Sequence, residues 1–243
     1  MNTSLGRHVY GLAAIGLGVC ALIWPDFIRQ LEPPMKIPYA QILIDCFAIA
    51  QIGGGLAIQF PRLARAGAAA LAIVYAIFTL LWLPLWIQSP LVFDSLGNAF
   101  ELFAMLCGAL IVYGRKAARI GYVGFGVSVV SFALYQAVHL DVTAKLVPKW
   151  IPPGQMFWAV VTTIAFALAA AALLSDRSAL LAARLTTLML VGFGLLIWVP
   201  ATLSAPHNPG NWAELGLTFG IAGAAWIVAD YVARRRAGAF RTA

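Results

Sequence analysis

Long apolar segments recur along the whole chain, and this pattern limits the possible fold more than any other feature. A helix that crosses a membrane needs about 20 mostly apolar residues. Proline, glycine and charged residues divide the 243 residues into eight apolar segments of about that length. We therefore expect membrane-spanning helices at about residues 7–24, 41–60, 67–88, 97–114, 119–138, 156–174, 180–202 and 211–231.

The composition agrees with this interpretation. Hydrophobic residues make up 62% of the chain and charged residues 10%, whereas a typical soluble domain contains about 25% charged residues. A water-facing globule of this composition would lack the polar groups needed to cover its surface. The composition excludes a soluble enzyme, a disordered tail and a disulfide-rich secreted module. It predicts an all-α polytopic membrane protein with eight transmembrane helices.

Basic residues are distributed unevenly between the two sides of the predicted spans. The two termini and the second, fourth and sixth loops hold 12 of the 16 Lys and Arg residues, and the remaining loops hold 4. Cytoplasmic segments carry such an excess, so we expect both termini in the cytoplasm and an even number of spans. The net charge of +7 has the same cause, and we expect no nucleic-acid partner.

Four short motifs occur twice, in the same order and at similar spacing, which indicates an internal duplication. The paired segments are Ile37–Gln41 and Ile151–Gln155, Trp82–Pro84 and Trp198–Pro200, Ser89-Pro90 and Ser204–Pro206, and Gly97–Leu102 and Gly210–Leu215. We predict two four-helix repeats, residues 1–116 and 117–243, joined at the basic stretch Arg115–Arg119. Because each repeat has four spans, the copies are parallel and related by a pseudo-two-fold axis along the membrane normal.

All these paired motifs map to the non-cytoplasmic side of the predicted topology. The long first and fifth loops, at about 25–40 and 139–155, lie on the same side and are rich in proline. We expect these loops to form structured caps or re-entrant turns. We also expect any functional site at this face.

The second half contains a distinctive series of segments: Leu146–Pro152, Phe157–Ala159, Trp198–Pro200, Pro206-His207 and Asn211–Glu214. In these segments it resembles the DoxX-like family of four-helix bacterial membrane proteins. The first half is a more diverged match, so the resemblance covers nearly the whole chain as a tandem pair. It implies a doubled four-helix bundle in the bacterial inner (cytoplasmic) membrane.

The resemblance also implies possible partners. Some DoxX-like proteins are linked to quinone-dependent sulfur oxidation, as in thiosulfate:quinone oxidoreductase, and others to oxidative-stress complexes. A quinone ligand and membrane redox partner proteins are therefore expectations for this chain. Such proteins often have a histidine before the proline that ends the third span. Here the corresponding positions hold Trp82 and Trp198, which weakens the transfer of a redox role.

Two acidic residues occupy equivalent positions in the repeats. Glu101 follows Asn98 by three residues, and Glu214 follows Asn211 by three. One interpretation is a helix cap, in which Asn and Glu satisfy the first amides of the helix. The other is a pair of carboxylates in a polar vestibule that bind a cation, a proton or a quinone carbonyl.

Asp45 is the third acid inside a predicted span. It lies four residues after Gln41 and therefore on the same helix face, and its equivalent in the second repeat is Ala159. It either bonds to a neighbouring helix or contacts a ligand in the first half. Tryptophans near the same face form either an aromatic belt or a stacking wall. The candidate ligand-binding residues are Asp45, Trp82, Asn98, Glu101, Trp198, Asn211, Trp212 and Glu214.

The chain has no recognisable catalytic motif. It contains no P-loop, no HExxH sequence and no GxGxxG sequence. Cys20, Cys46 and Cys107 lie in apolar segments without metal-ligand spacing, so we expect no metal site and no covalently bound cofactor. Three functions stay open: an accessory or quinone-binding subunit of a membrane redox system, a transporter or lipid-handling protein, and a structural membrane subunit.

Overall fold

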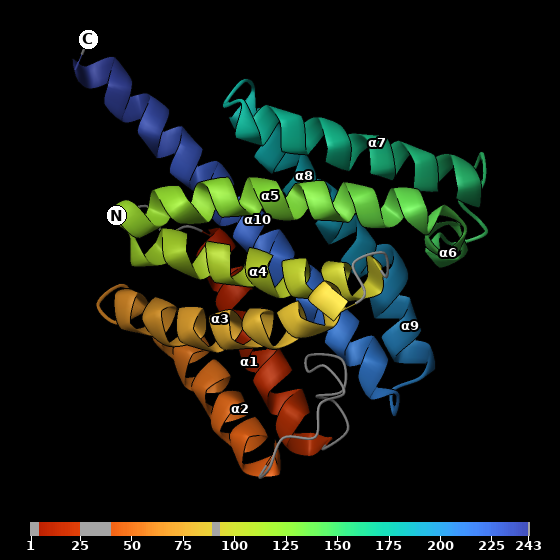
Figure 1. The fold of residues 1–243 in the computed structure, drawn as a ribbon, viewed down its shortest axis with the longest axis horizontal. Coiled ribbons are helices and arrows are strands. Elements are labelled where there is room, and N and C mark those ends of the chain that lie inside the picture. Colours follow the sequence, from red (N-terminus) through yellow and green to blue (C-terminus); the bar gives the residue numbers. More distant parts are fainter. Residues whose placement is uncertain (1–4, 25–39, 89–92, 243) are drawn as a thin grey trace.

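The computed structural model describes residues 5–24, 40–88 and 93–242, and every regular element in these ranges is helical (Figure 1). The elements are α1 (Leu5–Ile23), α2 (Ala40–Ala57), α3 (Ala64–Gln88), α4 (Phe93–Tyr113), α5 (Lys116–Val138), α6 (Leu140–Leu146), α7 (Gln155–Leu174), α8 (Ala179–Phe193), the π-helical turn η2 (Gly194–Trp198), α9 (Val199–Ser204) and α10 (Pro209–Thr242).

Seven helical segments in the described ranges are long and apolar enough to cross a membrane. One of them is continuous through α8, η2 and α9, from Ala179 to Ser204. The prediction of a multi-pass, all-helical membrane protein is therefore confirmed. The expected span at 41–60 corresponds to the apolar helix α2, which ends at Ala57 and is shorter than these seven segments, so the prediction of eight spans is not confirmed.

The helices pack in two series that follow the chain. In the first series α1 packs on α2, α2 on α3 and α3 on α4; in the second α5 packs on α7, α7 on α8 and α8 on α10. The two series meet through three contacts, α4 with α5, α10 with α1, and α4 with α10. The core lies where α1, α3, α4, α5 and α10 converge.

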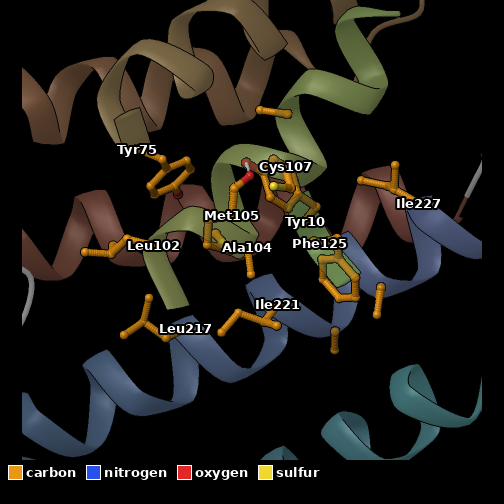
Figure 2. Packing of buried hydrophobic residues seen from close by; sticks show 14 of the residues in the cluster. Tyr10, Tyr75, Leu102, Ala104, Met105, Cys107, Phe125, Leu217, Ile221 and Ile227 are labelled. Carbon is orange, nitrogen blue, oxygen red and sulfur yellow. Dashed lines mark hydrogen bonds between the residues drawn. The ribbon is translucent and has the colours of Figure 1, made fainter. Parts of the chain in front are cut away.

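Buried aromatic and aliphatic side chains fill this core. Tyr10 of α1 is fully buried, and its hydroxyl donates a hydrogen bond to the Met105 carbonyl oxygen of α4 at 2.7 Å. Figure 2 shows Leu217 and Ile221 of α10 on the side of that helix that faces α4. The hydrogen bond satisfies a phenol that would otherwise be costly to bury in an apolar interior.

Glycines allow α1, α2 and α3 to approach closely. A Cβ atom at Gly55 would lie 2.6 Å from the Gly11 carbonyl oxygen, and one at Gly67 would lie 2.6 Å from the Gly54 carbonyl oxygen. Small residues at helix contacts are typical of membrane bundles. Gly54 and Gly55 thus lie at close helix contacts, whereas a Cβ atom at the adjacent Gly53 would meet open space.

The two ends of the bundle differ. Both termini lie at one end in Figure 1, and α6 and α9 lie at the other. The expected cap in the 139–155 loop is confirmed as α6, whereas the corresponding first loop lies almost entirely outside the described residues, as do Ile37–Tyr39 and Ser89-Pro90. Helix α3 continues through Pro84, so this proline does not end the span.

A polar contact ties the loop after α7 to the last helix at the end that holds the termini. Arg235 forms a salt bridge and hydrogen bond with the Asp176 carboxylate. The Tyr122 hydroxyl lies 2.6 Å from the Leu173 carbonyl oxygen and 3.0 Å from Asp176 Oδ1. The Arg235 guanidinium also lies over the Tyr122 ring, 5.2 Å from its centroid. These contacts connect α5, the α7–α8 loop and α10.

Candidate functional site

A cavity of about 230 Å³ lies between α4, α5, α6, α7, the end of α8 and α10. It is at the end of the bundle where α4 and α10 begin and α5 ends. Its polar lining consists of Asn98, Glu101, Tyr135, Gln136, Thr143, Glu214 and Thr218. Its apolar lining includes Phe132, Leu146, Phe166, Leu190, Phe193, Trp198 and Ile221.

Glu101 and Glu214, which occupy matching positions in the paired sequence motifs, both line this cavity. Glu101 comes from α4 and Glu214 from α10, and both side chains are partly buried. The fold therefore brings together two acidic groups that are more than a hundred residues apart in sequence.

The capping interpretation of these glutamates does not match the helix boundaries. Helix α4 begins at Phe93, so Asn98 and Glu101 lie within it and not at its first turn. Helix α10 begins at Pro209, and Asn208 accepts a hydrogen bond from the Gly210 N–H at 2.9 Å. Asn211 instead donates to the Ala201 carbonyl oxygen at 2.9 Å. Neither Asn–Glu pair forms a capping box.

Gln136 is held at the cavity wall by α7. Its side-chain oxygen lies 3.3 Å from the hydroxyl groups of both Thr162 and Thr163. Each hydroxyl lies closer still to a carbonyl oxygen of α7, at 2.9 Å for Thr162 to Trp158 and 2.7 Å for Thr163 to Ala159, so its proton is shared between two acceptors. The Gln136 amide thus lies against polar groups of α7 at the cavity wall.

A second, mainly apolar cavity of about 150 Å³ adjoins the first. The two share five lining residues, which are Gln136, Thr143, Leu146, Phe193 and Trp198. Beyond these, Pro148, Ile151, Leu196 and Ile197 contribute apolar walls. Together the two cavities form a compartment with acidic and amide groups at one side and aliphatic and aromatic groups at the other.

The π-helical turn η2 lies at the boundary between these two cavities. It ends at Trp198, which lines both of them. A Cβ atom at Gly194 would lie 2.7 Å from the Phe219 ring, so α8 approaches α10 closely at this point. Pro200 lies two residues after Trp198 and lacks the N–H that would continue the helical bonding. π-Helical turns occur frequently at functional sites.

Four of the eight candidate residues lie outside this cavity. Asp45 accepts a hydrogen bond from Gln41 at 3.0 Å, as their spacing predicts, but on α2. Trp82 is buried in the core at 6% exposure. Asn211 bonds to Ala201, and Trp212 stacks on Trp24 with 6.3 Å between ring centroids. Asn98, Glu101, Trp198 and Glu214 are the four that the fold brings together.

Sequence analysis missed several residues that complete the site. Gln136 is a polar residue inside an apolar span, and such residues are functional candidates, so its position was detectable. Thr143 lies on α6, whose approach to the bundle is a tertiary feature. Phe166 and Phe193 look like ordinary lipid-facing aromatics, and no sequence pattern separates them from the others.

Comparisons with known proteins found no match to a protein-family model, to a curated protein or to a solved structure. Within the described ranges, no group of three or more His, Cys, Asp and Glu side chains is placed to hold a metal ion. The site is therefore assessed from its own geometry.

Proposed function

We propose that this membrane protein binds a lipid-soluble ring compound of the quinone type and serves as an accessory subunit of a membrane redox system. The observation that carries this proposal is the shared cavity of Glu101 and Glu214, with an apolar compartment beside it. A quinone needs hydrogen-bonding groups at its ring carbonyls and apolar space for its tail. The two adjoining cavities supply both kinds of surface.

The residues of the cavity have distinct roles in this proposal. A protonated Glu101 or Glu214 donates a hydrogen bond to a ring carbonyl oxygen, and the ionised form accepts a proton from a ring hydroxyl. The Gln136 and Asn98 amides orient the ring, and Trp198 stacks against it. A partner protein of the redox system supplies or removes the electrons.

The proposal includes a DoxX-like tandem architecture. The packing of α1, α2, α3 and α4 is repeated by that of α5, α7, α8 and α10. The contact of α4 with α5 is matched by that of α10 with α1, as a pseudo-two-fold axis requires. In this arrangement α2 is the eighth span, and the basic residues orient both termini toward the cytoplasm of the bacterial inner membrane.

The test is the ligand content of protein purified gently from its native membrane. Solvent extraction and quantification of quinone against protein should give about one quinone per chain. The double variant Glu101→Gln/Glu214→Gln preserves side-chain size and removes both acids. We expect it to lose most of the bound quinone.

Two matched variants control this experiment. Asp45→Asn removes an intramembrane acid outside the cavity, and Trp212→Ala removes a tryptophan outside it; both should retain quinone. Trp198→Ala removes a tryptophan inside the cavity and should release it. Wild-type protein without quinone, or equal quinone in the double variant and wild type, contradicts the proposal.

A second candidate is a transporter or lipid-handling protein. Helices α4 and α10 pack on each other where the two series of helices meet. The observation that favours this function is that one carboxyl group of the cavity comes from each of these two helices. Tandem repeats with a substrate site at their interface are a common transporter plan. Proton or cation uptake into liposomes, abolished by Glu101→Gln/Glu214→Gln, would favour this function over quinone binding.

A further inference from the structure

A groove of about 680 Å³ lies between α4 and α5 at the end of the bundle that holds the termini. Its lining consists of Phe103, Lys116, Arg119, Ile120, Val123 and Gly124. It is separate from the Glu101–Glu214 cavity, which lies at the opposite end of α5. The groove thus combines two cations with an apolar floor.

The cations and the apolar residues follow one face of α5 in order. Lys116 is the first residue of this 23-residue helix, and Arg119 follows one turn later. Ile120, Val123 and Val127 continue along the same face at helical spacing and are exposed. Since 23 residues span about 35 Å, the helix crosses the hydrocarbon layer and its first turn lies at the interface.

Gly124 allows the two helices that form this groove to approach closely. Gly124 is buried, and a Cβ atom there would lie 2.7 Å from Cys107 Sγ and 3.0 Å from the Phe103 ring. Helix α5 therefore sits close to α4, and the Phe103 ring forms the floor between them.

The charges of the groove have no protein counterion in the part of the chain that is described. Lys116 and Arg119 are exposed and form no ion pair there. Two other basic residues at this end have partners within the protein: Arg235 pairs with Asp176, and Arg65 lies over the Tyr113 ring. A phosphate group is the complement that two such cations at a membrane interface favour.

We propose that the groove binds an anionic phospholipid, with the headgroup phosphate at Lys116 and Arg119 and an acyl chain along Phe103, Ile120 and Val123. The charge of the groove selects the headgroup class, and its apolar floor distinguishes a lipid from a soluble phosphate. This site does not depend on the ligand proposed for the Glu101–Glu214 cavity.

The test compares lipid binding to the full chain in detergent by native mass spectrometry, with phosphatidylglycerol and phosphatidylcholine as probes. Wild-type protein should retain phosphatidylglycerol preferentially. The double variant Lys116→Gln/Arg119→Gln should bind phosphatidylglycerol about 30-fold more weakly, because each basic residue near a membrane surface contributes about fivefold. Its binding of phosphatidylcholine should not change.

Two further variants separate this site from general surface charge. Arg62→Gln/Arg184→Gln removes two exposed cations at the same end but outside the groove, and it should retain phosphatidylglycerol binding. Val123→Trp keeps both cations and fills the groove, so it should weaken binding of the intact lipid. Equal losses in the two double variants would overturn the proposal, as would displacement of the lipid by millimolar glycerol phosphate.

Discussion

At the scale of single residues, Asp176 is the acid whose environment is most clearly defined outside the spans. Partial burial of its carboxyl opposes ionisation, but hydrogen bonds from Arg235 and Tyr122 outweigh this and lower its pKa below the ordinary 3.8. Its backbone is left-handed, with φ of 59°, a conformation that Asp and Asn tolerate better than most residues. The residue therefore combines a turn with an ionic contact.

We predict that Asp176→Asn lowers the melting temperature in detergent by about 1–3 °C at pH 7, since an exposed ion pair contributes about 0.2–1 kcal/mol. Asn keeps the turn and removes the charge. A lowered pKa stabilises the fold above the ordinary pKa, and this contribution is lost as the pH falls through the folded value. The difference between wild type and variant should therefore begin to shrink as the pH falls to about 3.8 and should shrink further toward the lower pKa of the folded protein, as measured by melting from pH 7 to 3.

The glutamates show which residue-level features were predictable. Their matching positions in the paired sequence motifs, and the cost of an acid inside a membrane, marked Glu101 and Glu214 from the sequence alone. The spacing from Asn98 and Asn211 equally suggested caps, because an Asn three residues before a Glu is a common helix start. Only the helix boundaries separate the two, since α4 begins five residues before Asn98.

At the scale of elements, α1, α2 and α3 approach one another closely. These contacts depend on glycines that face a neighbouring backbone, and adjacent glycines in one run differ in this respect. A Cβ atom at Gly55 would meet the Gly11 carbonyl oxygen at 2.6 Å, whereas one at Gly53 would meet nothing within 4 Å.

This difference predicts opposite effects for two neighbouring substitutions. Gly53→Ala should stabilise the protein by about 0.5–1 kcal/mol, because alanine reduces the backbone entropy lost in a helix. Gly55→Ala should destabilise it by about 1–3 kcal/mol through overpacking against α1. Thermal unfolding of both variants in one detergent measures the effect, and a shift of the same sign in both would contradict the packing described.

Element boundaries followed from hydropathy, but local irregularities did not. The predicted spans agree with the helices to within a few residues at most ends, because apolar length is a strong signal. The π-helical turn at Gly194–Trp198 was not foreseen, since it reflects the close approach of Gly194 to Phe219 on another helix. Proline lacks the N–H that continues helical bonding, yet α3 continues through Pro84.

At the scale of the whole molecule, the loops at the two ends should face opposite sides of the membrane. In a variant without its three native cysteines, Lys149→Cys lies between α6 and α7, and Arg177→Cys lies between α7 and α8. Both positions are exposed. A membrane-impermeant maleimide should label Lys149→Cys in bacterial cells with a permeabilised outer membrane. It should reach Arg177→Cys only after the inner membrane is opened; the reverse pattern would invert the orientation inferred from the basic residues.

The composition predicted the membrane class, and the duplicated motifs predicted which acids correspond to each other. The cavity could not be predicted from the sequence, because its walls form only when α5, α6, α7 and α8 pack around Glu101 and Glu214. One short connecting helix, α6, contributes Thr143 and Leu146 to it, and nothing in seven residues of sequence specifies where such a helix docks.

The carboxyl groups of Glu101 and Glu214 belong to different helices, so their separation depends on how α4 and α10 sit against each other. An occupant that bonds to both groups would link these two helices, and two ionised carboxylates without an occupant would repel each other. Occupancy of the cavity and the packing of α4 against α10 are therefore coupled. An occupant that favours one packing of the two helices binds more tightly when that packing is already in place, and the coupling free energy is the same in both directions.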